Sequence, residues 1–369
     1  MTTTVMLSTD QEDIREVARR YLGSEYDSDS VREIIATEEG FDERRWREVS
    51  ELGWPAIALP EEHGGMGFSS IERCLLLEEM GRFLLPSPFL SSAVLAADVV
   101  AFAAGADARA SLLPAIGEGT ARATLAGPRW LRLQADPGAV RAAADGALSG
   151  DAGLTLDAQT ADTLIVIADV DGETGLFVVD PDAAGVTREP APTVDPTRRL
   201  ARVTFDSTAA ERIDDGDGTA AALEHAVDRA TVALAAEMAG TAQRCVEMTV
   251  DYARDREQFG APIGSFQAVK HRCADMSVEA DAAREAVYFA ADVIESGDLD
   301  NLPVAASTAK IAASEALVAV SAATIQLHGG IGYTWEHDAH LFYKRALLSA
   351  RMLGTAAEHR DRLARAFDV

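Results

Sequence analysis

The sequence predicts an α+β protein in three parts: an N-terminal helical domain (1–119), a middle antiparallel β-barrel or sandwich (120–215) and a C-terminal four-helix bundle (216–369). Apolar residues recur at helical spacing in the first and last parts, whereas the middle part has short β-branched runs bounded by Gly, Asp and Pro. These strands do not alternate with long helices, which disfavours a doubly wound parallel sheet.

The N-terminal part begins with a helix start at Ser8-Thr9-Asp10-Gln11, followed by apolar residues on one helical face. The segment Pro60–Gly67 (PEEHGGMG) is an irregular loop, and we expect a helix from Ser69 through Leu85. Pro86 and Pro88 end that helix, and an alanine-rich helical segment continues to about residue 115.

The middle part contains three clear strand patterns, at 163–168, 175–179 and 201–205. The C-terminal part returns to long helices. We expect them at about 219–254, 266–294 and 303–327, with a fourth from about Ala339 that follows a glycine turn.

Composition excludes several function classes. The chain has 369 residues, of which 48% are hydrophobic, and a net charge of −27. Such a surface repels nucleic acid and anionic membranes. We expect a cytoplasmic location, since the start lacks a signal-peptide pattern and no apolar run approaches bilayer-spanning length. Cys74, Cys245 and Cys273 match no disulfide or metal pattern and are expected to be buried thiols.

Two turns between bundle helices have residue types suited to an anionic, ring-bearing ligand. The first, Arg254–Gln267 (RDREQFGAPIGSFQ), offers arginines for a phosphate and phenylalanines for stacking. These arginines could equally complement the dipole at the end of the preceding helix. The second, Gln326–Thr334 (QLHGGIGYT), places three glycines in four positions and permits close approach to the main chain. A following helix start makes it a candidate pyrophosphate seat, and a plain helix–turn–helix corner is the alternative.

Taken together, the order helical–β–helical, the PEEHGGMG loop, the REQFGAPIGSFQ turn and the QLHGGIGYT turn resemble the acyl-CoA dehydrogenase family. The resemblance covers essentially the whole chain and is strongest in 45–90 and 225–355. It implies a flavoprotein that oxidises an acyl-CoA thioester to its α,β-unsaturated form, with an electron-transferring flavoprotein as electron acceptor. FAD in that family lies between two subunits. By this resemblance, the cofactor-binding residues of this chain are Arg256, Gln258, Phe259, Gln326, Gly329 and Gly330.

The positions that hold the catalytic glutamate in this family carry other residues here. Counting 23 residues from Gly330 places Leu353 where the family usually has its base, followed by the retained Gly354 and Thr355. The alternative base position, on the first bundle helix, is Ala230. Neither leucine nor alanine can accept a proton, so we assign no catalytic residue.

The part of the family's site that contacts the flavin ring and the thioester is altered as well. The strand that should present a threonine to the flavin ring reads Leu154-Thr155-Leu156-Asp157, and 124–142 lacks the family's thioester-side loop. An arginine usual on the first bundle helix is replaced by Thr231.

We therefore expect a subunit that lacks the base in a two-gene α2β2 acyl-CoA dehydrogenase. The segment HGGIGYTWEHDAHL is similar to bacterial members acting on steroid side-chain CoA thioesters. The partners implied are an acyl-CoA, a second acyl-CoA dehydrogenase-like subunit or a second copy of this chain, and no nucleic acid or membrane. One alternative is a self-sufficient homotetramer with a relocated base at Glu237, Asp228 or Glu358. The other is a scaffold that binds no flavin.

Several polar or aromatic residues have two interpretations. Glu336, His337, Asp338 and His340 cluster in sequence, yet their spacing favours a solvated helix start over a metal site, so no metal is expected. Asp195 neighbours Pro196 and is expected in a turn. Trp130 and Trp335 either line a pocket or pack within the fold.

Overall fold

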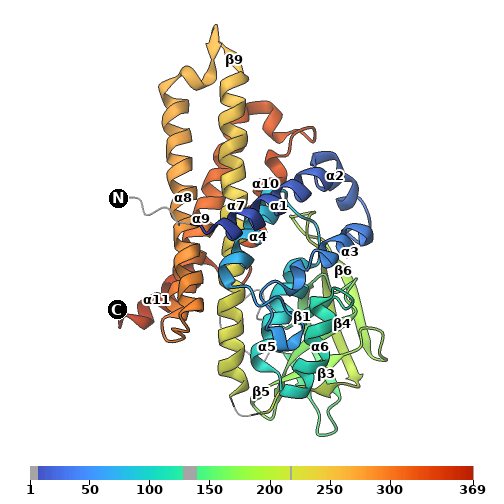
Figure 1. Cartoon of the computed structure of the whole chain (residues 1–369). Coiled ribbons are helices and arrows are strands. Elements are labelled where there is room, and N and C mark those ends of the chain that lie inside the picture. Colours follow the sequence, from blue (N-terminus) through green and yellow to red (C-terminus); the bar gives the residue numbers. More distant parts are fainter. Residues whose placement is uncertain (1–6, 128–138, 217, 369) are drawn as a thin grey trace.

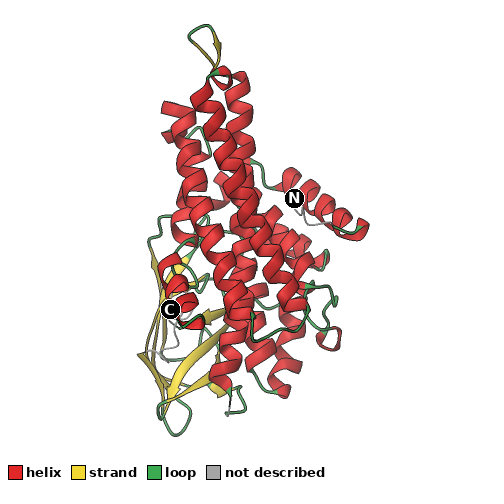
Figure 2. Cartoon of the chain, turned by 90° about the vertical axis from the view of Figure 1, so that its left-hand side faces the viewer, coloured by secondary structure: helices red, strands yellow, loops and turns green. Residues whose placement is uncertain are grey.

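The computed structural model describes residues 7–127, 139–216 and 218–368. N-terminal helices lie over a curled β-sheet, and a tall helical bundle stands beside both (Figure 1). Turned by a quarter, the molecule shows the sheet at one end of the bundle and a small β-hairpin projecting beyond the other end (Figure 2). The three-part architecture predicted from the sequence is confirmed; the exact domain limits at 119 and 215 stay a prediction.

The N-terminal part is built from capped helices. Ser8 and Ser69 begin α1 and α4 with reciprocal capping boxes, as expected from the sequence for the first helix. The helices are α1 (Thr9–Glu25), α2 (Ser28–Ile35), α3 (Glu43–Glu51), α4 (Ser70–Arg82), the π-helix η3 (Leu90–Ala96), α5 (Ala97–Ala103) and α6 (Ala106–Gly117). Helix α4 is buried on nearly all sides, because α1 covers one flank and α7 (Thr219–Asp255) the other.

The middle part is an eight-stranded sheet with strand order β6-β7-β3-β2-β4-β5-β8 and β1 beside β4. Its strands are β1 (Ala123–Ala126), β2 (Ala139–Ala142), β3 (Leu148–Leu156), β4 (Thr163–Val170), β5 (Glu173–Val179), β6 (Val186–Ala191), β7 (Leu200–Thr208) and β8 (Glu211–Arg212). Five of its pairings are antiparallel, but β1 and β2 each pair with β4 in parallel. Periodicity reveals strands and not their partners, so this mixed character could not be expected from the sequence.

The bundle contains α7, α8 (Gln267–Glu295) and α9 (Leu302–His328) as three long helices. The expected glycine turn contains the short 3₁₀ helix η6 (Gly329–Tyr333), and the expected fourth helix is divided into two short helices, α10 (Ala339–Ser349) and α11 (Ala356–Ala366). The division between α10 and α11 occurs at Leu353 and Gly354, which both have positive φ angles that a continuous helix excludes.

Helix α9 is apolar enough to resemble a membrane span, but it is a core helix of the bundle. The segment Leu302–Tyr333 is long and apolar enough to span a membrane, which corrects the expectation that no apolar run reaches that length. However, 61% of its most apolar window is buried, and α9 packs against α7, α8, α10 and α11. Core helices of bundles have this composition, so the segment is weak evidence for a membrane span.

Candidate functional site

The first predicted turn is a β-hairpin at the exposed tip of the bundle. Strands β9 (Glu257–Gln258) and β10 (Ala261–Pro262) pair antiparallel and extend beyond α7 and α8 (Figures 1 and 2). Phe259 and Gly260 form its two-residue loop, both with positive φ, as in tight hairpins. The sequence predicted a turn here but not the strand pairing.

The three residues that the sequence assigned to cofactor binding in this hairpin all face outward. Arg256, Gln258 and Phe259 are exposed, and the Phe259 side chain is 95% accessible. Its ring meets Phe266 edge-to-face at 6.2 Å. A large aromatic residue this exposed costs solvation free energy unless another surface covers it, so the hairpin has the character of a contact element.

The second predicted turn ends α9 and lies next to the base of the hairpin. Tyr252, one turn before Arg256, stacks on His328 at 4.3 Å and donates a hydrogen bond from its hydroxyl to the His328 carbonyl oxygen. His328 directly precedes Gly329. The structure therefore brings the two turns to the same end of the bundle, and Tyr252 and His328 are the residues that join them.

Backbone geometry explains the first glycine of the glycine turn, and the second leaves the main chain uncrowded. Gly329 has a φ of +65°, and no atom lies within 4 Å of the place where a Cβ of Gly330 would stand. Gln326, Gly329 and Gly330 are exposed. An uncrowded main chain beside an exposed arginine-bearing hairpin fits a pyrophosphate group, so these residues fit the FAD contact that the resemblance implies.

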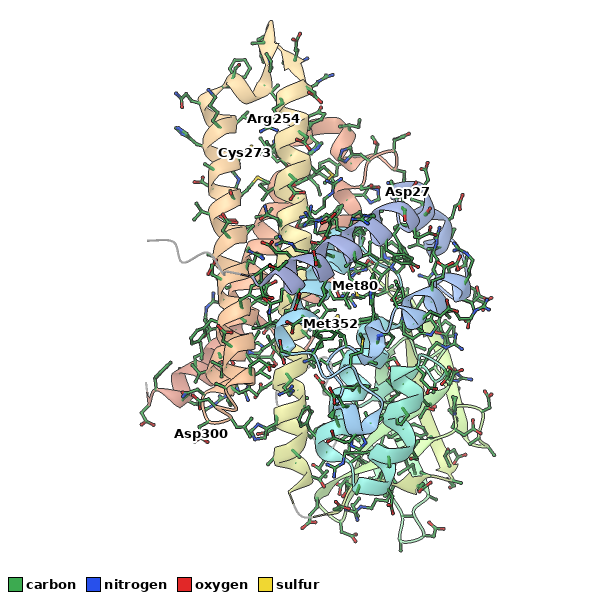
Figure 3. All side chains as sticks on the ribbon, viewed as in Figure 1. Asp27, Met80, Arg254, Cys273, Asp300 and Met352 are labelled. Atoms are coloured by element: carbon green, nitrogen blue, oxygen red, sulfur yellow. The ribbon has the colours of Figure 1, made fainter. Side chains whose placement is uncertain are left out.

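By contrast, the two positions that carry the catalytic base in the family are buried in this chain. Leu353 has no exposed surface and a φ of +54°, and Ala230 is buried on α7. Figure 3 shows Met352, the neighbour of Leu353 in sequence, near the middle of the molecule and Arg254 near the hairpin end. Thr231, at the family's arginine position, is buried and donates its hydroxyl to the carbonyl oxygen of Val227.

Side chains from α9 and α11 fix the loop that contains Leu353. The Lys310 ammonium, fully buried, donates to the carbonyl oxygens of Gly354 at 3.1 Å and Ala350 at 3.4 Å. The His359 ring is also fully buried, and its Nε2 lies 2.9 Å from the Leu353 carbonyl oxygen. Burial lowers the pKa of Lys310 to about 7 and that of His359 to about 4.

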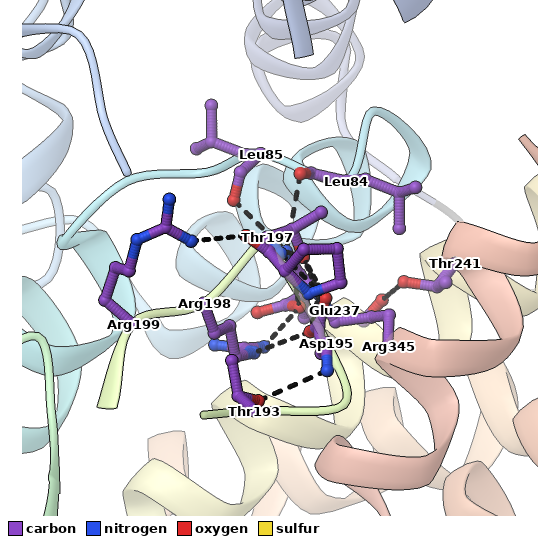
Figure 4. Close-up of polar contacts among 11 residues, drawn as sticks. Leu84, Leu85, Thr193, Asp195, Thr197, Arg198, Arg199, Glu237, Thr241 and Arg345 are labelled. Atoms are coloured by element: carbon purple, nitrogen blue, oxygen red, sulfur yellow. Dashed lines mark hydrogen bonds and ion pairs between the residues drawn. The ribbon is translucent and has the colours of Figure 1, made fainter. Parts of the chain in front are cut away.

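Glu237, the first candidate for a relocated base, belongs to a buried ion cluster at the junction of the three parts (Figure 4). It accepts from Arg198 at 2.6 Å and also from Arg345, and Arg345 in turn lies 2.9 Å from Asp195. Burial alone would raise the pKa of Glu237, but the two guanidinium groups outweigh it and hold that pKa below its ordinary value. A carboxylate held ionised by two arginines is a poor proton acceptor.

The other two candidates for a relocated base also form structural contacts. Asp228 forms a two-point ion pair with Arg362 of α11, with one contact at 2.8 Å. Burial raises the pKa of Asp228 despite that pair. Glu358 accepts from the backbone N–H of Thr355 at 2.7 Å and from its hydroxyl, which makes it the capping-box residue of α11.

The strand that the resemblance assigns to the flavin ring carries Thr155, whose side chain is fully buried near the end of β3. Leu156 is buried at the end of β3, and its carbonyl oxygen accepts from the Thr124 hydroxyl at 2.5 Å. Of the altered segment 124–142, residues 128–138, which include Trp130, lie outside the described residues.

The predicted environments of Asp195 and of the three cysteines can be compared with the structure. Asp195 begins a turn, as expected, because the N–H of Arg198 donates to its carbonyl oxygen, but its side chain is fully buried in the ion cluster. Cys74 and Cys245 are buried, as expected, but Cys273 is partly exposed. Within the described ranges no group of three or more His, Cys, Asp or Glu side chains could hold a metal ion.

Comparison with known proteins places this architecture in a family. Residues 8–120 match the model of the acyl-CoA dehydrogenase N-terminal domain, and 216–367 match that of the C-terminal domain. The chain is 38% identical over 335 residues to the acyl-CoA dehydrogenase IpdE2 of Mycobacterium tuberculosis, covering 90% of each protein. It is 35% identical to IpdE2 of Mycolicibacterium smegmatis, covering 97% of this chain and 98% of the relative.

Solved structures of two-component proteins are also similar. A variant of the Tcur3481-Tcur3483 steroid ACAD is 31% identical, with a TM-score of 0.86 and coverage of 98% of this chain and 99% of that one. The ChsE4-ChsE5 complex from Mycobacterium tuberculosis is 27% identical, with a TM-score of 0.89 and 99% coverage of both chains. The chain belongs to the acyl-CoA dehydrogenase family.

Proposed function

We propose that this chain is the subunit lacking the catalytic base in a heteromeric FAD-dependent acyl-CoA dehydrogenase that acts on steroid side-chain CoA thioesters. The observation that carries the proposal is a contrast within one molecule. Both family base positions are apolar and buried, whereas the residues assigned to FAD project outward from the hairpin and the glycine turn. The similarity to a steroid acyl-CoA dehydrogenase and to a two-component complex supports the same assignment.

In this proposal Arg256 and Gln326 bind the pyrophosphate of a flavin held mainly by the partner subunit, and Phe259 packs against the cofactor. Gly329 and Gly330 leave the main chain open to that group. When bound, FAD accepts the hydride that leaves Cβ of the acyl chain. The base that removes the α-proton is supplied by the partner, because Leu353 and Ala230 have no group that accepts a proton.

The buried ion cluster and the buried loop at Leu353 support the proposal that the partner subunit supplies the base. Glu237, Asp228 and Glu358 each satisfy a structural partner, so none is available to move between a substrate proton and solvent. We extend the proposal to a cytoplasmic location and to an electron-transferring flavoprotein as acceptor, both on family resemblance.

The test is to purify this chain alone and after co-expression with each acyl-CoA dehydrogenase-like chain encoded beside it. We expect flavin absorbance and turnover of a steroid side-chain CoA thioester only in a pair. Turnover by the single chain would contradict the proposal and favour a self-sufficient enzyme. A stable pair without flavin would favour a scaffold.

A further inference from the structure

Three aromatic side chains stack at the end of the bundle, where the hairpin and the glycine turn meet. The centre of the Tyr252 ring of α7 lies 4.3 Å from that of His328 at the end of α9. The His328 ring also lies 4.3 Å, centre to centre, from the ring of His337 in the loop before α10. His328 is buried, and the other two residues are half-buried. The stack therefore joins three elements that are separate in the sequence.

Two rings of this stack are attached directly to residues assigned to FAD. The N–H of Arg256 donates to the carbonyl oxygen of Tyr252 at 2.8 Å, and His328 is the covalent neighbour of Gly329. Arg256 and Gly329 are thus connected through one backbone hydrogen bond and one pair of stacked rings. Because this connection is short, any movement of Tyr252 relative to His328 changes the distance between the arginine and the glycine turn.

The glycine turn packs on His328. No atom lies within 4 Å of the place where a Cβ of Gly329 or Gly330 would stand, in the part of the chain that the structure describes. Gly332 is the buried residue of η6, and a Cβ added to it would come within 3.2 Å of the His328 Cβ. The position of the turn therefore depends on where His328 is held.

The ring nitrogens of His328 face the protein and not an incoming ligand. Its Nδ1–H donates to the carbonyl oxygen of Thr324 at 2.7 Å, and its Nε2 is buried with no hydrogen-bond partner among the described residues. His337 uses its Nδ1 to accept from the N–H of Ala339 at 3.1 Å, at the start of α10. A neutral imidazole in this state offers flat faces for stacking. His328 therefore acts through its neighbours, which makes it a positioning residue.

We propose that the Tyr252–His328–His337 stack positions the hairpin and the glycine turn relative to each other, so that Arg256 and the main chain of Gly329 and Gly330 bind one FAD pyrophosphate together. A ligand contacted by two separate turns binds tightly only when both are already correctly spaced, because ordering them on binding costs free energy. The use of this spacing for FAD rests on the proposed function, whereas the stack and its attachments are features of this chain alone.

The first test needs no flavin. Hydrogen exchange of the isolated full chain, followed by mass spectrometry, measures local opening of the peptides that contain 256–263 and 326–334. We expect both peptides to exchange at least tenfold faster in His328→Ala and at the wild-type rate in His328→Phe, which keeps a ring in the stack. Leu113→Ala, which removes a fully buried side chain from α6, is the control for lost stability and should leave the exchange of both peptides unchanged.

The second test measures coupling in the complex with the partner subunit, stripped of flavin and titrated with FAD. We expect Arg256→Met to weaken FAD binding at least tenfold when His328 is present. In a His328→Ala background the same change should weaken binding less than threefold, because an arginine at the wrong spacing no longer shares the pyrophosphate. His328→Phe should preserve the full effect of Arg256→Met. A residue that only stabilises the fold would leave the two effects additive.

Unchanged exchange of the two peptides in His328→Ala, or additive effects of His328→Ala and Arg256→Met on FAD affinity, would overturn the inference. If exchange rises as expected but no complex binds flavin, the proposed function is removed and the positioning role of the stack remains. If an active, flavin-loaded pair forms and His328→Ala alters neither exchange nor FAD affinity, the proposed function remains and the positioning role is removed.

Discussion

The guanidinium of Arg345 on α10 lies 2.9 Å from the carboxylate of Asp195 in the loop before β7, and both side chains are buried. Arg345 also contacts Glu237 of α7 and lies 3.3 Å from the Leu84 carbonyl oxygen after α4. One side chain thus links the N-terminal helices, the sheet and the bundle (Figure 4). With Arg198, the cluster contains two arginines and two carboxylates, so its charges balance inside the fold.

Replacing Arg345 should be strongly destabilising. Arg345→Met leaves two buried carboxylates opposite Arg198 alone, and removing one partner of a buried pair costs about 3–5 kcal/mol. Urea unfolding followed by circular dichroism would measure the loss. Arg360→Met removes an exposed pair with Glu315 and is the control, with an expected effect below about 1 kcal/mol. Equal unfolding free energies for the two variants would show that the ion cluster does not stabilise the fold.

Glu237→Gln separates a structural role from a catalytic one. The amide keeps the shape but leaves Arg198 and Arg345 with one carboxylate, so we expect a lower midpoint of unfolding. Turnover per bound flavin in the assembled complex should stay unchanged, measured by single-turnover flavin reduction. If reduction fell by several orders of magnitude in a variant of normal stability, Glu237 would be the relocated base.

The sequence predicted the fold more fully than the site, and particular residues show why. The limits of α7, α8 and α9 follow from apolar periodicity, and the capping box at Ser8 is a local pattern. The turn at Asp195 is a local pattern and was predicted, but its ion pair with Arg345 was not, because Arg345 lies far away in the chain. The Tyr252–His328 stack that joins the two turns has no local signal either. Contacts of this kind depend on how elements pack, which periodicity does not encode.

Gly330→Ala should affect flavin without affecting folding. Nothing lies within 4 Å of the added Cβ, and Gly330 has no positive φ, so the chain should unfold at an unchanged urea concentration. The methyl group would occupy the space next to the main chain that we assign to the pyrophosphate. Flavin content of the co-purified complex, read from its visible spectrum, should fall at least tenfold. Unchanged flavin content would remove the glycine turn from the cofactor site.

Lys310 should make stability depend on pH in a defined window. Its pKa falls from 10.5 in the unfolded chain to about 7 in the fold, chiefly through burial. Between these values the unfolded chain binds the extra proton, so stability rises with pH and is lost as pH falls toward 7. The difference in unfolding free energy between wild type and Lys310→Met should therefore change by about 1.4 kcal/mol per unit from pH 7 to 9. Lys270→Met, at an exposed position, should show no such slope.

Phe259→Ala tests whether the hairpin acts on a partner and not on its own chain. The ring is 95% exposed and meets Phe266 edge-to-face near the tip, so its removal should leave the unfolding free energy of the isolated chain within about 0.5 kcal/mol. In the heteromeric complex the same change removes an aromatic anchor, which typically costs about 2 kcal/mol or more and corresponds to at least a tenfold loss of flavin or partner affinity. Phe367→Ala, at an exposed site after α11, is the matched control. If both variants retained flavin equally, the exposure of Phe259 would need another explanation, and the trans contact would have to rest on Arg256 and Gln326 alone.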